Sequence, residues 1–195
     1  FDDQVSPAEG TSSEEFYQIY HKFGYDQAVS RASDSLSYVY RLDEKYWLMM
    51  LDSCMCEPVH ETGGKLSEET VAWMKTQLEE AKKQGVTVIP VSHHNLLDES
   101  TLYPEECTIE NTKEVTALLE AYGVPVYLSG HLHLQRIKKH TSNLNTPGGY
   151  GIREIVTSPL PMAPCQYSIL NWQADGSLSY HTKKVDIAGW AQRYG

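Results

Sequence analysis

This chain of 195 residues has no long apolar run and little positive charge, and these two absences argue against two classes of function. No apolar run is long enough to cross a bilayer, so no membrane-spanning segment is expected in it. Positive charge is scarce, with 16 Lys and Arg against 26 Asp and Glu and a formal net charge of -10. Because nucleic-acid backbones are anionic, broad binding to a nucleic-acid backbone is not expected either.

A secretory signal pattern is also missing. The chain begins with Phe1 rather than Met, so we expect its true start to have been removed or to lie upstream. The localisation of the protein is therefore left undecided by the sequence.

Cysteines are few and scattered along the chain. Cys54 and Cys56 are too close in sequence for an easy mutual disulfide, and Cys107 and Cys165 stand apart from them. This spacing indicates neither a zinc knuckle nor a disulfide scaffold. We expect unpaired thiols in partly buried surroundings.

The size and composition that remain are typical of one globular domain. The chain is 41% apolar and 10% aromatic, which is sufficient for a sizeable core, and it contains no internal repeat. We expect a single domain over residues 1–185 and the beginning of a further helical segment over residues 186–195.

Hydrophobic periodicity predicts an alternation of helices and strands, which is typical of the α/β class. Helices are predicted to begin at Ser13, Ser67 and Asn111. The first has an apolar stripe ending at Phe23, and the third is expected to be capped by Asn111 together with Glu114. Strands are predicted at Leu36–Tyr40, Tyr46–Leu51, Val86–Val91, Val124–Leu128, Ile152–Val156, Gln166–Trp172 and Leu178–Val185. Pro90 lacks a backbone donor, so we expect the pairing of its strand to bend or break there.

Two of these strands end in histidines. Val86–Val91 is followed by His93, His94 and Asn95, and Val124–Leu128 is followed by Ser129, Gly130, His131 and His133. Glycine at Gly130 permits a sharp turn close to whatever the histidines bind. Because the carboxyl ends of neighbouring strands share one edge of an α/β sheet, both groups are predicted to converge there.

Other polar residues allow two interpretations. Asp52 follows a strand, where it either caps a loop or faces the site, and His60 is expected to be a solvated loop residue. The basic cluster Arg136, Lys138, Lys139 and His140 is either a solvated strand face or positive charge beside an anionic substrate.

Neutral imidazole suits zinc, iron, manganese and similar cations. His93, His131 and His133 are enough for a single-zinc site with an open position. They could also supply the histidine ligands of a two-metal site that binds a phosphoryl group, although such a site needs carboxylate ligands as well.

The segment Val91-Ser-His-His-Asn-Leu-Leu97, followed by Ser129-Gly-His-Leu-His133, resembles the second half of the calcineurin-like metallophosphoesterases, and most closely their bacterial cyclic-nucleotide phosphodiesterase branch. Phe23-Gly-Tyr25, Ser35-Leu-Ser-Tyr38 and Leu51-Asp-Ser53 support the resemblance, which covers nearly the whole chain. It implies the carboxyl-terminal half of a four-layer α/β/β/α sandwich with a mixed sheet.

The resemblance also implies site roles and cofactors. His93 and His131 would bind one metal and His133 another, among two divalent cations of manganese, iron or zinc type. His94 would be a catalytic residue, acting behind the ligands or on the substrate, and Asn95 a substrate-binding residue. The reaction implied is hydrolysis of a small-molecule phosphoester, more specifically a phosphodiester such as a cyclic nucleotide, by metal-bound hydroxide.

The chain departs from the family because the Asp-x-His, Gly-Asp and Gly-Asn-His-Asp motifs of the family's first half are absent. We therefore expect an amino-terminal half, a second chain or an oligomer partner to complete the site, and this chain alone to be inactive. Two alternatives remain: a single-zinc hydrolase that uses three histidines, and a non-catalytic binding or structural fragment.

Overall fold

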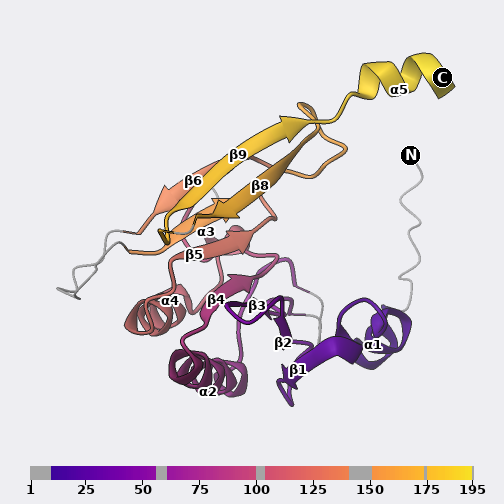
Figure 1. Ribbon diagram of the computed structural model, residues 1–195. Coiled ribbons are helices and arrows are strands. Elements are labelled where there is room, and N and C mark those ends of the chain that lie inside the picture. Colours follow the sequence, from indigo (N-terminus) through magenta and orange to yellow (C-terminus); the bar gives the residue numbers. More distant parts are fainter. Residues whose placement is uncertain (1–9, 56–60, 100–103, 141–150, 174, 195) are drawn as a thin grey trace.

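A seven-stranded mixed sheet organises the computed structural model, which describes residues 10–55, 61–99, 104–140, 151–173 and 175–194 (Figure 1). The strand order in this sheet is β1-β2-β3-β4-β5-β7-β6, and a separate hairpin is formed by β8 and β9. The central strands β3, β4, β5 and β7 are mutually parallel, whereas β1, β2 and β6 pair antiparallel with their neighbours. The predicted α/β class with a mixed sheet is confirmed.

The strand boundaries follow the sequence closely in most places. The strands are β1 Ala28–Arg31, β2 Tyr38–Arg41, β3 Tyr46–Met50, β4 Thr87–Val91, β5 Val126–Ser129, β6 Arg136–Lys139, β7 Arg153–Val156, β8 Gln166–Trp172 and β9 Leu178–Lys184. Strand β4 keeps a continuous register with β3 through Pro90, but it pairs with β5 only at Val91 and Leu128. The predicted loss of pairing at Pro90 therefore occurs on the β5 side alone.

The helices are α1 Ser13–Tyr20, α2 Glu68–Gln84, α3 Pro104–Cys107, α4 Thr112–Ala121 and α5 Ile187–Tyr194, and a 3-10 turn spans Tyr25–Gln27. Helix α2 begins where the Ser67 hydroxyl accepts from the Thr70 amide, and it ends at Gly85 in the left-handed conformation, with φ 69°. Glycine adopts this conformation without steric cost. In the described parts of the chain, no helix is long and apolar enough to span a membrane.

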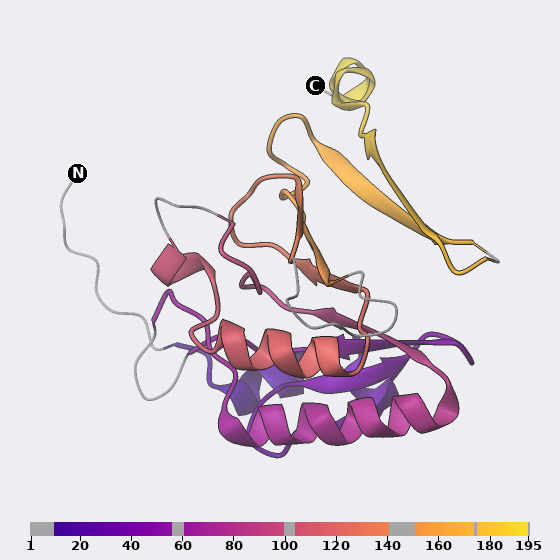
Figure 2. The same cartoon turned by 90° about the vertical axis from the view of Figure 1, so that its left-hand side faces the viewer.

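Helices α2 and α4 cover one face of the large sheet (Figure 2). Their apolar stripes pack on strand residues such as Val39, Trp47, Met49 and Val88 in one buried cluster. Each of these large side chains contributes roughly 1.5–3 kcal/mol by leaving water. The stripe residues that this packing buries are Val71, Met74, Leu78 and Ala81 of α2 and Val115 and Leu119 of α4.

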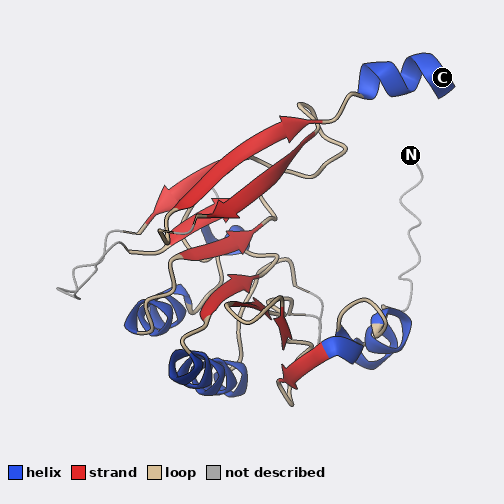
Figure 3. Ribbon diagram, viewed as in Figure 1, coloured by secondary structure: helices blue, strands red, loops and turns tan. Residues whose placement is uncertain are grey.

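The β8–β9 hairpin lies on the opposite side of the sheet (Figure 3). Its Leu170, Trp172 and Tyr180 pack with Ile89 and Ile155 from the large sheet, so this second face is partly covered. Helix α5 follows the hairpin and none of its residues is buried. A domain division after residue 185 stays a prediction.

Three local expectations were wrong or incomplete. The apolar stripe predicted for the first helix is not covered by the other described elements, because Phe16, Ile19 and Phe23 are exposed, and α1 ends at Tyr20, before Phe23. Asn111 does not cap α4 with its side chain, because its amide bonds the backbone of Leu66 instead. Strand β1 and helix α3 were not predicted, and β6 was expected only as one of two interpretations of its basic residues.

The setting of the cysteines can be checked at three positions, and Cys54 is exposed rather than partly buried. Cys107 and Cys165 are buried, unpaired thiols. Cys56, like His60, lies outside the described residues.

Candidate metal centre

The two histidine segments lie side by side because β4 and β5 are parallel neighbours. Backbone hydrogen bonds join the segments directly: the Ser92 amide donates to the Leu128 carbonyl at 3.0 Å, and the Gly130 amide donates to the His93 carbonyl at 3.0 Å. The histidines therefore lie at the carboxyl edge of the parallel strands, as the sequence predicted.

The rings of His93 and His131 are in direct contact. Nε2 of His93 lies 2.9 Å from Nδ1 of His131, and the two ring planes are nearly perpendicular, at 89°. Because two nitrogen lone pairs repel each other, a proton or a cation must lie between them. Burial, followed by the nearby charges of His131 and His133, lowers the pKa of His93, which favours the neutral form that binds metals.

The backbone around His131 is held in an uncommon conformation. His131 has φ 61° and His133 has φ 54°, whereas Gly130 does not have a positive φ. The sharp turn that the sequence assigned to Gly130 is therefore made by the histidines themselves. A left-handed conformation costs a residue with a side chain roughly 1–2 kcal/mol, and such strain is concentrated at functional sites.

His94 is buried behind these two rings, with its ring centroid 4.8 Å from that of His131. Its Nε2 faces the Thr62 carbonyl at 3.1 Å, so Nε2 carries the proton, and Nδ1 accepts from the Ser53 hydroxyl at 2.8 Å. Burial lowers the pKa of His94, in agreement with a neutral ring. Both nitrogens are thus engaged, which favours a supporting position over direct contact with substrate; the predicted catalytic role of His94 stays a prediction.

Gly64 makes room for the ring of His94. A Cβ atom at this position would lie 2.4 Å from Cγ of His94, which real Cβ atoms do not tolerate. The Gly64 carbonyl also accepts from the Glu110 amide at 2.8 Å. The loop that carries Thr62 is therefore fitted closely against His94.

Asn95 is fully buried and joins the two histidine segments. Its Nδ2 donates to the Ser129 hydroxyl at 2.9 Å and to the Gly130 carbonyl at 3.2 Å. Its Oδ1 has no hydrogen-bond partner among the described residues. The substrate contact predicted for Asn95 stays a prediction. In the structure, its side chain links the His93 segment to the His131 segment through these two hydrogen bonds.

His133 is exposed and lies near enough to His93 to influence its pKa, but no contact joins the two rings. Among the described residues, no group of three or more His, Cys, Asp or Glu side chains is arranged to hold one metal ion. Zinc–nitrogen bonds of about 2.0–2.1 Å place two ligand nitrogens roughly 3.0–3.4 Å apart. The 2.9 Å between His93 and His131 is close to that spacing, so these two residues fit as a pair of ligands that needs further donors.

Asp52 and two members of the basic cluster have structural partners, although Asp52 also lines the cleft described below. Asp52 accepts from the amides of Cys54 at 3.2 Å and Leu36 at 3.3 Å, which confirms its capping role. In the basic cluster, Arg136 forms an ion pair with buried Glu99 at 3.1 Å, and His140 bonds Glu120 at 2.8 Å. These side chains fasten β6 to neighbouring segments.

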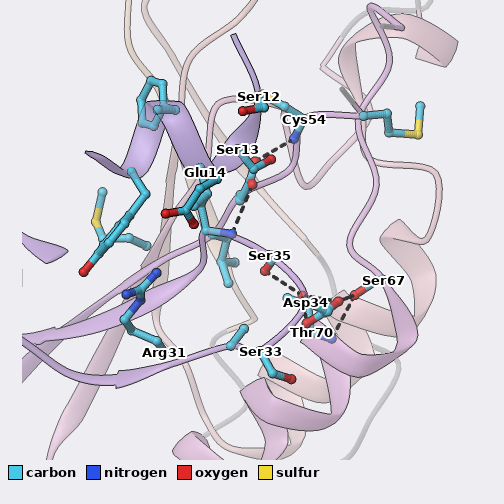
Figure 4. A pocket seen from close by; sticks show the side chains of 18 of the residues that line it. Ser12, Ser13, Glu14, Arg31, Ser33, Asp34, Ser35, Cys54, Ser67 and Thr70 are labelled. Atoms are coloured by element: carbon cyan, nitrogen blue, oxygen red, sulfur yellow. Dashed lines mark hydrogen bonds between the residues drawn. The ribbon is translucent and has the colours of Figure 1, made fainter. Parts of the chain in front are cut away.

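An open cleft of about 1040 Å³ lies at the same edge of the sheet, beyond the end of β3. None of the described histidines lines this cleft; its lining reaches Asp52 and Cys54, on either side of the buried Ser53 that bonds His94. Figure 4 shows the side chains of Arg31 and Ser33 in its wall, with Asp34 held between Ser67 and Thr70. The Arg31 guanidinium lies 4.1 Å from the centre of the Tyr17 ring.

Sequence reasoning missed the residues that support the histidines: Ser53, Thr62, Gly64, Ser129 and Glu154. Ser53 and Ser129 stood within quoted motifs, but no role was assigned to them. Glu154 had a signal of its own, because strand alternation places it on the same face as the apolar Ile152 and Val156.

Comparison with known proteins shows a likeness of fold. Neither a protein-family model nor a curated protein sequence matches this chain. Among solved structures, it is similar to a dimetal phosphatase from Danio rerio, with a TM-score of 0.50 and 14% sequence identity over 66% of this chain. The chain spans about half, 52%, of that phosphatase. The chain therefore shares its α/β fold with part of that phosphatase.

Proposed function

We propose that this protein takes part in the metal-dependent hydrolysis of a phosphoester. The observation that carries the proposal is the 2.9 Å approach of His93 Nε2 and His131 Nδ1 at the carboxyl edge of the sheet. The similar zebrafish structure, described as a dimetal phosphatase, supports it. The cofactors proposed are two divalent cations, of manganese, iron or zinc type.

The residues of this chain would hold and orient the first cation. His93, whose pKa is lowered by burial, and His131 offer ring nitrogens, and the exposed His133, whose charge reaches His93, is proposed for the second cation. When bound, divalent cations lower the pKa of a coordinated water and neutralise charge on phosphoryl oxygens. His94 keeps the His131 ring in place by packing against it, since its own nitrogens are taken by Ser53 and Thr62.

We further propose that carboxylate ligands come from a polypeptide segment outside this sequence, either upstream or in a partner chain. Two dications and a phosphate cannot be balanced by imidazoles, which carry no negative charge when neutral. The coverage of about half the zebrafish chain supports this proposal, because the remainder of that protein has no counterpart here.

Within the phosphoesters, we propose a phosphodiester such as a cyclic nucleotide. The cleft that reaches Asp52 and Cys54 has room for the organic part of such an ester, and the aromatic side chains of Tyr17 and Tyr25 line it. Arg31 lines the same cleft and forms no salt bridge within the described part of the chain, so its charge is available to an anion.

The test is an assay of the protein with manganese or zinc against bis-(p-nitrophenyl) phosphate, p-nitrophenyl phosphate and a cyclic nucleotide. Two preparations are compared: the 195-residue chain alone, and the same chain with its upstream coding sequence restored. We expect turnover from the extended protein, loss of that turnover in His131→Ala, and little turnover from the chain alone. Turnover that survives chelation of the metal, or that persists in both His93→Ala and His131→Ala, would contradict the proposal.

A further inference from the structure

Glu154 has a buried carboxyl group on β7, the strand between β5 and the edge strand β6. It lies on β7, opposite Tyr127 of β5 in the parallel register, and its side chain has no exposure to solvent. A buried charge is costly unless it is hydrogen-bonded, so its partners explain why the position tolerates an acid.

Three donors converge on this carboxylate. Oε1 accepts from the Leu96 amide at 2.7 Å and from the Ser129 hydroxyl at 2.6 Å, and Oε2 accepts from the Leu97 amide at 2.6 Å. The two amides belong to the segment that follows His93, and Ser129 precedes His131. One side chain thus bonds both histidine segments.

The direction of the hydrogen bonds follows from these donors. Because the Ser129 hydroxyl donates its proton to Glu154, its oxygen is free to accept from Nδ2 of Asn95, and that bond is present at 2.9 Å. The chain of bonds therefore runs from Asn95 through Ser129 to Glu154. Asn95 also donates to the Gly130 carbonyl, at the residue before His131.

We propose that Glu154 is a positioning residue that holds the His93 and His131 segments in register, so that the two imidazole nitrogens meet at a spacing suited to one divalent cation. The cation-binding part of this inference rests on the function proposed above. The positioning part rests only on the hydrogen bonds between Glu154 and the two segments. It requires the β4 and β5 ends to separate more readily when the carboxylate is lost, since β4 and β5 share a single strand pair, Val91 with Leu128.

The test variant is Glu154→Gln, which keeps the size of the side chain. Glutamine offers one acceptor oxygen, and its NH2 group faces at least one of the three donors, which is then left unpaired. Ile155→Ala is the matched control: it removes packing at the next residue of β7, on the hairpin side of the sheet, and leaves the Glu154 contacts intact. Ser129→Ala is a milder second variant for use if Glu154→Gln folds poorly.

The first measurement is amide hydrogen exchange of the metal-free protein. We expect the amides of Leu96, Leu97 and Gly130 to exchange at least tenfold faster in Glu154→Gln than in Ile155→Ala at equal overall stability. Gly130 is the decisive amide because it bonds His93 and has no direct contact with Glu154. Equal Gly130 exchange in the two variants would overturn the positioning role.

The second measurement is zinc affinity by isothermal titration calorimetry on the same proteins. Loss of a residue behind the ligands weakens metal binding by roughly tenfold or more, so Glu154→Gln should bind zinc about ten times more weakly than Ile155→Ala. Unchanged affinity would overturn the cation-binding part. If the unsubstituted protein binds no zinc but the exchange result holds, the proposed function fails while the positioning role stands.

Discussion

The backbone of Gly64 lies so close to the ring of His94 that a Cβ atom there would be 2.4 Å from Cγ of His94. The ring cannot move aside easily, because Ser53 and the Thr62 carbonyl each bond one of its nitrogens. This arrangement ties a loop far away in sequence to the histidine pair.

Gly64→Ala should therefore lower the free energy of unfolding by about 1–3 kcal/mol, as overpacking does in other cores. Urea denaturation measures this change. Gly130→Ala is the control within the same site, because a Cβ there would have no neighbour nearer than 3.8 Å. A loss from Gly130→Ala equal to that from Gly64→Ala would show that the close approach to His94 is not the cause.

The left-handed conformation of His131 leads to a second prediction. At φ 61°, alanine is strained and glycine is not. His131→Gly should be more stable than His131→Ala by about 1 kcal/mol, by urea denaturation without metal, while both lose zinc binding. The opposite order of stability would mean that the backbone at this position relaxes when the histidine is removed.

The pH dependence of stability gives a third prediction. Burial raises the pKa of Glu154 from 4.5 to about 7, although hydrogen bonds from Ser129, Leu96 and Leu97 lower it. Between pH 4.5 and about pH 7, Glu154 keeps its proton in the folded chain but has released it in the unfolded chain. The free energy of unfolding therefore falls as the pH rises through this range. The loss is on the order of 3 kcal/mol and is complete above about pH 7.

Comparison with Glu154→Gln isolates this group, because the variant has no proton to lose there. The stability advantage of the unsubstituted protein over the variant should shrink between pH 5 and pH 8, measured by urea denaturation. Glu99, whose pKa is also raised by burial, is present in both proteins, and its charge adds to the rise in the pKa of Glu154. A constant difference would show that the three donors keep Glu154 ionised throughout this range.

A fourth prediction concerns Arg31 in the cleft. Replacing it with alanine should raise the KM for an anionic phosphodiester roughly tenfold while changing kcat little, because its charge would attract substrate but lies away from the histidine pair. Steady-state kinetics on the extended protein measure both constants. An equal fall in kcat with unchanged KM would place Arg31 in the reacting site instead.

Much of the fold could be predicted from sequence because its signals are local. Helix α2 has a capping serine, an apolar stripe and a terminal glycine, and all of them act as expected. Strand β1 was missed because it is a four-residue edge strand with an irregular register to β2, so tertiary pairing defines it rather than its own pattern. Asn111 was misassigned because its amide found a partner in Leu66, 45 residues away in sequence.

In the candidate site, the histidines could be predicted from the sequence, but most of the residues that support them could not. Histidines after two strands reveal where a site lies, and His93 and His131 do meet. The residues that hold them, such as Ser53, Gly64 and Glu154, act across 25 to 58 residues of sequence. Strand alternation marks Glu154 as buried, but the sequence does not indicate which residues these three contact.

The central claim, that His93 and His131 together bind a divalent cation, is tested most directly by anomalous X-ray diffraction from crystals of the protein grown with zinc. We predict a zinc peak about 2.1 Å from both Nε2 of His93 and Nδ1 of His131, and its loss in His131→Ala. Crystals at saturating zinc that show no peak between these two nitrogens, or only peaks at unrelated surface groups, would contradict the account.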